Sequence, residues 1–288
     1  MIALAPPART GEVVTEGRRV GWREWGDVAG APVLFCTGAG TSSALGFGAG
    51  AVRARGVRLV AIDRAGLGLS APDPDKSFAS WSRDVAAVLA ALGHARAPVV
   101  GFSQGGPFAV ALAGAGLASA LALVAATDEL AHPSMRPRLH ADVAGLVAAI
   151  AADRAGFEAA FASRVDADGM WQLVRAMSAP EDRAIYDEPA FAAAYRAALE
   201  EGFAQGPAGY VRDLVLASSP WPVAPEAIDV RADLWYGARD TSPVHSPDHG
   251  ATLARRFPRA RLHQLAGEGA ALLWTRADDI LAALLSRG

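Results

Sequence analysis

Short apolar runs separated by helical patterns recur in the first and last thirds of the chain. Unbroken apolar runs of this length are typical of parallel strands that are buried on both faces. The predicted strands are 32–36, 56–62, 98–101, 121–125, 230–236 and 260–265. The predicted helices are 43–55, 81–92, 108–117, 247–257 and 270–286. Strands that alternate with helices predict an α/β fold, a mostly parallel sheet with helices on both faces.

Two local patterns refine this picture. Residues 11–25 alternate in the manner of strands around the turn Glu16-Gly17-Arg18, which predicts an antiparallel hairpin. Ser80 precedes the helical pattern of 81–92, and serine is a preferred residue at the start of a helix. We therefore expect Ser80 to be the N-cap of that helix.

The alternation of strands and helices stops between residues 128 and 225. Helical segments divided by proline and glycine fill this stretch, so we predict a helical cap over 128–225 inserted into an α/β core of residues 1–127 and 226–288. The large apolar residues of the cap are expected chiefly to pack within it, with some facing a ligand. They are Met135, Phe157, Phe161, Met170, Trp171, Met177, Tyr186, Tyr195 and Tyr210.

The predicted strand at 98–101 leads directly into Gly101-Phe102-Ser103-Gln104-Gly105, and a helical run follows. A serine between two glycines at a turn from strand to helix is the pattern of a nucleophile elbow. Glycine lets the strand and the helix approach closely, and the N-terminus of the helix faces the site where an oxyanion forms. We expect the Ser103 hydroxyl to project into a cleft.

Composition narrows the possible functions. The chain has 288 residues, 52% of them hydrophobic, and a net charge of −3, without a basic patch that would indicate nucleic acid as a partner. Cys36 is the single cysteine, which excludes a disulfide framework within the chain. The sequence shows no cofactor motif, no metal-binding cluster, no signal peptide and no apolar run of membrane-spanning length, so we expect a cytoplasmic protein without a cofactor.

Taken together, these motifs resemble the α/β-hydrolase superfamily over nearly the whole chain. The resemblance implies Ser103 as the nucleophile and Asp240, after the strand that follows the cap, as the acid. It implies an oxyanion hole made by the backbone N–H groups of Ala39 and Gln104. The segment 63–70 is similar to the D-R-P-G-x-G-x-S pattern of the superfamily, with alanine at the proline position.

The chain departs from the superfamily at the catalytic histidine. Ala270 stands where the histidine is expected, in a segment that resembles G-x-G-H. A base relocated to His245, His249 or His263 is one alternative, but none of these has the expected position, and ordinary hydrogen-bonding roles are favoured for them. Because alanine cannot accept a proton, the sequence predicts that the usual triad does not operate.

Three functions remain open at this point. The first is a non-hydrolytic or substrate-assisted enzyme of epimerase or isomerase type, acting on a small molecule or a peptide. This departure resembles the atypical α/β-hydrolase-fold members of peptide natural-product pathways, including the aspartate epimerase of bottromycin biosynthesis. The second is an esterase or amidase inactivated at position 270, and the third is a ligand-binding pseudoenzyme. The residues expected to bind the substrate are Thr37, Gly38, Phe102, Phe108, Trp171 and Ala270.

Overall fold

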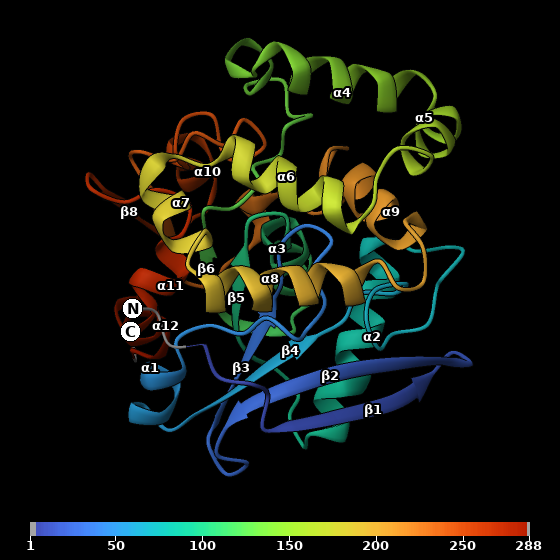
Figure 1. Cartoon of the computed structure of the whole chain (residues 1–288). Coiled ribbons are helices and arrows are strands. Elements are labelled where there is room, and N and C mark those ends of the chain that lie inside the picture. The colour runs from blue at the N-terminus through green and yellow to red at the C-terminus, as the bar shows by residue number, and fades with distance from the viewer. Residues whose placement is uncertain (1–3, 287–288) are drawn as a thin grey trace.

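The computed structural model describes residues 4–286, and in this part of the chain eight strands form one sheet with helices on both faces (Figure 1). The spatial order is β1-β2-β4-β3-β5-β6-β7-β8. The first two strands form the predicted antiparallel hairpin, and the second of them also pairs antiparallel with β4, while the other neighbours are parallel. The predicted α/β fold is therefore confirmed. The strands are β1 (Arg9–Thr15), β2 (Arg18–Gly26), β3 (Ala31–Cys36), β4 (Val57–Ile62), β5 (Ala97–Phe102), β6 (Ala118–Val124), β7 (Ala232–Gly237) and β8 (Ala260–Leu265).

The strands in the middle of the sheet are apolar throughout because each faces two hydrophobic cores. Val33 and Phe35 of β3 belong to the core on one face, whereas Leu34 and Cys36 belong to the core on the other. Successive side chains of a strand point to opposite faces, so both sets are buried. One face is covered by α1 (Ala49–Ala54), α11 (Leu272–Thr275) and α12 (Ala277–Leu285), and the other by α2 (Phe78–Ala91), α3 (Gly105–Gly114) and α10 (Ala251–Arg256).

Several helices differ in extent from their predictions. The helix expected over 43–55 is confined to α1, because Gly48 adopts the left-handed conformation at its start and the preceding residues form a loop. The N-cap of α2 is Ser77 rather than Ser80, which instead completes a capping box with it. The helix expected over 270–286 is two helices, α11 and α12, which are divided at Arg276.

The stretch between β6 and β7 is helical, and no strand interrupts it among these fully described residues. Figure 1 shows α4, α5 and α6 at the opposite end of the molecule from the β1–β2 hairpin. The division into a core of 1–127 and 226–288 and a cap of 128–225 stays a prediction. Two 3₁₀ turns occur, η1 (Arg136–Arg138) and η2 (Pro225–Ala227). The α-helices of the stretch are α4 (Ala141–Ala152), α5 (Arg154–Ala162), α6 (Ala167–Met177), α7 (Pro180–Tyr186), α8 (Pro189–Gly202) and α9 (Ala208–Ala217).

The length and polarity of the helices bear on membrane association. The longest of those described, α2 and α8, have 14 residues each. A bilayer-spanning helix needs about 20 apolar residues. Within residues 4–286, none of the helices meets the length and hydropathy that such a span requires.

Replacing Glu24 by glutamine is expected to destabilise the fold in a pH-dependent manner. Burial opposes ionisation of this carboxylate, but hydrogen bonds from Arg58, Trp22 and Arg9 outweigh it and lower the pKa of Glu24 to about 2. A pKa below the unfolded value of 4.5 stabilises the fold above pH 4.5, and the contribution is lost as the pH falls toward 2. We expect a loss of about 3 kcal/mol in the free energy of unfolding at neutral pH.

Urea unfolding of wild type and Glu24→Gln measures this difference at neutral pH and again below pH 4.5, where it should shrink. Glu12→Gln on the exposed side of β1 is the matched control and should leave stability unchanged at both pH values. If the loss in free energy of unfolding caused by Glu24→Gln stays constant with pH, the stabilisation does not come from the ionised carboxylate.

Candidate active site

Ser103 lies between β5 and α3 in a strained backbone conformation. Its φ angle is 50°, in the left-handed region that a non-glycine residue rarely adopts. Its N–H donates to the carbonyl of Val124 at 3.1 Å, which ties the turn to β6. A Cβ atom at Gly105 would lie 2.1 Å from the carbonyl oxygen of Cys36, so only glycine allows α3 this close to β3. These features are the geometry of a nucleophile elbow.

A histidine lies against the serine, and it comes from the loop after β7. The Nε2 atom of His245 is 2.9 Å from the Oγ atom of Ser103, and its Nδ1 atom is 2.6 Å from the Oδ2 atom of Asp240. An ionised carboxylate only accepts hydrogen bonds, so Nδ1 carries the proton and Nε2 is free to accept the serine proton. His245 and Asp240 have side chains that are 8% and 3% exposed, which keeps water from competing for these bonds.

The loop after β7 is folded around the carboxylate of Asp240. One oxygen, Oδ1, accepts the N–H of Ser242 at 2.9 Å, while the other holds His245. Burial opposes ionisation of Asp240, but the charge and hydrogen bond of His245, together with the Ser242 N–H, bring its pKa below the ordinary value. Ser246 donates to Asp128 at 2.9 Å and so attaches the loop to the segment after β6. The loop therefore holds the imidazole in one place and one tautomer.

The sequence favoured ordinary hydrogen-bonding roles for the histidines, whereas the structure places His245 within hydrogen-bond distance of Ser103. Ala270 at the expected position has no imidazole, and the less favoured alternative, a base relocated to another histidine, agrees with the contact between His245 and Ser103. A triad depends on geometry rather than on sequence position. Asp240 and His245 are separated by five positions, and the intervening turn brings both side chains to the same side of the loop.

The backbone around Ala270 is hydrogen-bonded to a carboxylate from a distant helix. Asp182, on α7, accepts the N–H of Ala270 at 3.0 Å and the N–H of Ala271 at 2.8 Å. Burial is the main cause that raises the pKa of Asp182, and the nearby charge of Asp240 adds to it. A contact between a cap helix and the loop after β8 thus occupies the backbone where the superfamily has its histidine. Nothing in the sequence around Asp182 indicated this contact.

The other histidines near the carboxyl end of the chain make different contacts. His263 is in β8, where its Nε2 atom lies 2.8 Å from Asp233 and its ring stacks on Trp235 at 3.8 Å between centroids. His249 has a φ angle of 50° in the turn that precedes α10. Neither has a hydrogen bond to Ser103 among the described residues, so His245 alone of these three contacts the serine.

The two backbone N–H groups expected to form an oxyanion hole have no protein acceptor in the part of the chain that the structure describes. They belong to Ala39 and Gln104, and both residues line the pocket that contains Ser103. Arg64 donates to the carbonyl of Gly38 at 2.9 Å. That carbonyl and the Ala39 N–H belong to one planar trans peptide and point in opposite directions, so Arg64 fixes the direction of the N–H.

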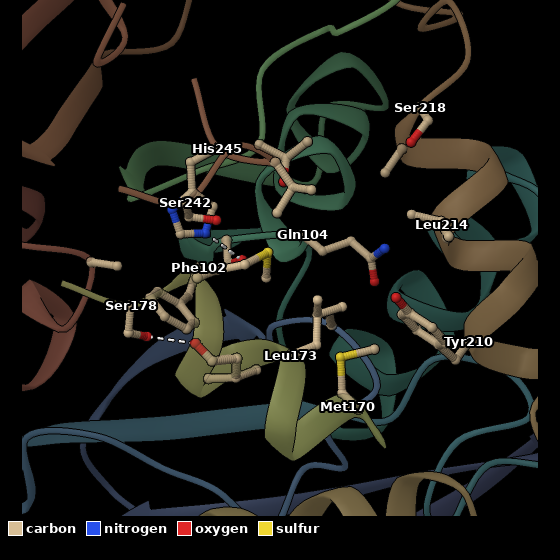
Figure 2. A pocket seen from close by; sticks show the side chains of 18 of the residues that line it. Phe102, Gln104, Met170, Leu173, Ser178, Tyr210, Leu214, Ser218, Ser242 and His245 are labelled. Carbon is tan, nitrogen blue, oxygen red and sulfur yellow. Dashed lines mark hydrogen bonds between the residues drawn. The ribbon is translucent and has the colours of Figure 1, made fainter. Parts of the chain in front are cut away.

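The pocket next to Ser103 has a cavity volume of about 90 Å³ and is largely apolar. Phe102, Ala270 and Gln104 line it, as the sequence predicted or implied for their positions. Figure 2 shows Met170 and Leu173 of α6 and Tyr210 and Leu214 of α9 around the same space. The remaining lining residues are Ala39, Ser103, Thr127, Leu130, Leu146, Val174, Met177, Ser178, Tyr186, Tyr195, Ala217, Ser218, Ser242, Val244 and His245.

Four residues expected to bind substrate do not line this pocket. Thr37 turns its hydroxyl to the carbonyl of Thr41, and Gly38 contributes its backbone to the contact with Arg64. Phe108 is fully buried in the core beneath the sheet. Trp171 packs on Tyr195 of α8 within a hydrophobic core, the kind of packing expected for most of the large residues of 128–225. Met170, Met177, Tyr186, Tyr195 and Tyr210 are the cap residues from the earlier set that do line the pocket.

Metal ions in proteins are bound chiefly by histidine, cysteine, aspartate and glutamate side chains. No group of three or more histidine, cysteine, aspartate or glutamate side chains in residues 4–286 is placed to hold a metal ion.

Comparison with known proteins identifies the family to which the fold belongs. A family profile described as "alpha/beta hydrolase fold" matches residues 31–277. A search of curated proteins finds no match. Among solved structures, an enol-lactonase from Burkholderia xenovorans LB400 has a TM-score of 0.72 and 21% identity, covering 96% of this chain and 100% of that one. The esterase RhEst1 from Rhodococcus sp. ECU1013 has a TM-score of 0.67 and 20% identity, covering 97% and 99%. An esterase from Exiguobacterium antarcticum has a TM-score of 0.64 and 15% identity, covering 94% and 97%.

Proposed function

The chain belongs to the α/β-hydrolase fold family, and on that premise we propose that it is a serine hydrolase of carboxylic esters or lactones. The observation that carries the proposal is the continuous chain of contacts from Ser103 through His245 to Asp240. The descriptions of similar structures as esterases and an enol-lactonase support the ester class.

In the proposed reaction, the Oγ atom of Ser103 attacks the substrate carbonyl while the Nε2 atom of His245 takes the serine proton. The negative charge on the carbonyl oxygen is stabilised by the N–H groups of Ala39 and Gln104. Collapse of the intermediate breaks the ester bond, and His245 returns the proton to the leaving alkoxide. Water, deprotonated by the same histidine, then releases the acyl group and restores Ser103.

The epimerase-type alternative rested on the absence of a base for the serine. A histidine within hydrogen-bond distance removes that reason, and no contact in the site favours proton exchange over acyl transfer. The same contact speaks against an inactivated hydrolase and against a pseudoenzyme, because in both cases the serine would have no base.

We expect a fluorophosphonate ester to label the wild-type protein once, at Ser103, because only an activated serine displaces fluoride from phosphorus. Intact-mass spectrometry and peptide mapping measure the adduct, and turnover of p-nitrophenyl butyrate is followed in parallel. Ser103→Ala should be neither labelled nor active. A folded wild-type protein that shows neither labelling nor ester turnover would refute the proposal, and exchange of a substrate Cα proton in heavy water would then favour the epimerase type.

A further inference from the structure

The side chain of Gln104 has no protein partner for its amide oxygen. The residue is only 5% exposed, and Oε1 forms no hydrogen bond with any described residue. A buried polar atom without a partner costs free energy, so such atoms are rare and call for an explanation. The sequence motif explains the position of the Gln104 backbone beside the nucleophile, but it does not explain a buried carboxamide.

The carboxamide points into the pocket. Figure 2 shows the Gln104 side chain extending away from His245, toward Tyr210 and Leu214 of α9. Tyr210 is 4% exposed, and within residues 4–286 its hydroxyl makes no hydrogen bond to protein. Burial, with a smaller contribution from the charge of Asp213, raises the pKa of Tyr210 above its ordinary value, so the hydroxyl keeps its proton and can donate. An acceptor and a donor therefore face the same part of the cavity, among apolar side chains.

The pocket does not offer a charged partner for a ligand. Of the described residues that line it, none is aspartate, glutamate, lysine or arginine, and His245 is already paired with Asp240. The buried cation Arg64, which holds the Gly38 carbonyl, is paired with Asp213 at 2.7 Å. An anionic substrate would lose its hydration without gaining a counter-ion, whereas a neutral polar group could satisfy Gln104 and Tyr210.

We propose that Gln104 and Tyr210 form a polar subsite that selects neutral esters or lactones carrying an amide group. This inference rests on the proposed ester hydrolysis. A secondary amide supplies an N–H to the Oε1 atom of Gln104 and a carbonyl oxygen to the Tyr210 hydroxyl. The surrounding Met170, Leu173 and Leu214 contact the apolar parts of the same substrate. The subsite is distinct from the oxyanion hole, to which Gln104 contributes its backbone N–H and not its side chain.

Two pairs of p-nitrophenyl esters test this subsite. Each pair matches an amide with a ketone that differs only by CH₂ in place of N–H: N-acetylglycine with 4-oxopentanoate, and N-acetyl-β-alanine with 5-oxohexanoate. For the pair whose spacing fits, wild type is expected to prefer the amide by at least roughly tenfold in kcat/KM, because the ketone leaves the amide oxygen of Gln104 unpaired. The p-nitrophenyl monoester of succinate, which carries a carboxylate, is expected to be the poorest substrate.

Gln104→Leu should bring the amide-to-ketone ratio close to one, because it removes the acceptor of the amide N–H. Tyr210→Phe removes a donor to the carbonyl that the amide and the ketone share, so it should lower kcat/KM for both esters relative to p-nitrophenyl butyrate and leave their ratio largely unchanged. That loss provides the test if Gln104→Leu does not fold. If wild type hydrolyses the ketone esters and p-nitrophenyl butyrate but prefers neither amide ester, the subsite is overturned and the proposed ester hydrolysis stands. A failure to hydrolyse any of these esters would overturn both.

Discussion

Replacing His245 by alanine is expected to lower kcat/KM for p-nitrophenyl butyrate by about a thousandfold or more. A serine hydroxyl is a weak nucleophile unless a base removes its proton as it attacks. His245 lies 2.9 Å from that hydroxyl, and no other histidine side chain among the described residues has a hydrogen bond to it. Only the contribution of binding and the oxyanion hole should remain. Initial rates across a range of substrate concentrations measure the loss.

His249→Asn is the matched control for this experiment. His249 lies on the same loop and has a φ angle of 50°, a conformation that asparagine tolerates better than most residues. The control should therefore fold and keep substantial activity. Equal losses for His245→Ala and His249→Asn would indicate that the variants disrupt the loop, and would contradict a specific role for His245.

Restoring the histidine of the superfamily is not expected to increase activity. In Ala270→His, a new imidazole would find both oxygens of Asp240 already engaged, one with Ser242 and one with His245. Without a carboxylate to orient it, the new ring cannot replace the existing base. A large increase on Ala270→His that Ser103→Ala abolishes would instead show that His245 does not serve as the base.

The parts of the structure that the sequence predicted well depend on local or periodic signals. The unbroken apolar run in β3 identified a strand with two buried faces, and the glycines around Ser103 identified the turn after β5. The superfamily order then placed Asp240 correctly beside the site. For the strand and the turn, the residues that determine the feature are neighbours in sequence or follow a fixed period, whereas Asp240 was implied only by the resemblance to the superfamily.

The features that sequence reasoning missed depend on contacts between distant segments or on one loop's conformation. Asp182 meets the backbone of Ala270 across 88 positions, and no local pattern records that contact. The partnership of His245 with Asp240 has a weak local signal, an acid and a histidine five positions apart after a buried strand. That signal becomes decisive only when the loop is seen to fold back on the carboxylate.

A buried ionic cluster connects α9 to the peptide between Gly38 and Ala39, and Asp213 is at its centre. Asp213, on α9, lies 2.7 Å from Arg64 and 2.5 Å from Lys76, and all three side chains are at most 4% exposed. Lys76, the single lysine of the chain, also donates to the backbone carbonyls of Ala65 and Gly209. Arg64 in turn holds the Gly38 carbonyl that fixes the Ala39 N–H. The carboxylate therefore neutralises two buried cations and supports the peptide that is expected to bind the oxyanion.

Replacing Asp213 by asparagine is expected to reduce the free energy of unfolding by about 3–5 kcal/mol, because two buried cations lose their counter-ion while the shape of the side chain is kept. Burial lowers the pKa of Lys76 to about 8, and the charge of Asp213 opposes that effect. Because the ordinary value is 10.5, the unfolded chain binds more protons than the native protein between about pH 8 and 10.5, and stability rises with pH in that window. Without Asp213 the pKa of Lys76 falls further, so the stability of the variant begins to rise with pH at a lower pH than that of wild type. The difference in free energy of unfolding between the two should therefore shrink as the pH rises from neutral toward 8.

Urea unfolding of wild type and Asp213→Asn at several pH values measures the deficit, and the double variant Asp213→Asn/Lys76→Met should recover part of it and lose the pH dependence. Asp278→Asn is the matched control, since Asp278 pairs with Arg55 at 2.7 Å on the surface, where solvent screens the charges. The control should unfold close to wild type. Two results would contradict the view that unpaired buried charge lowers the free energy of unfolding. One is an equal loss of this free energy in Asp213→Asn and Asp278→Asn. The other is a larger loss in the double variant with Lys76→Met than in Asp213→Asn alone.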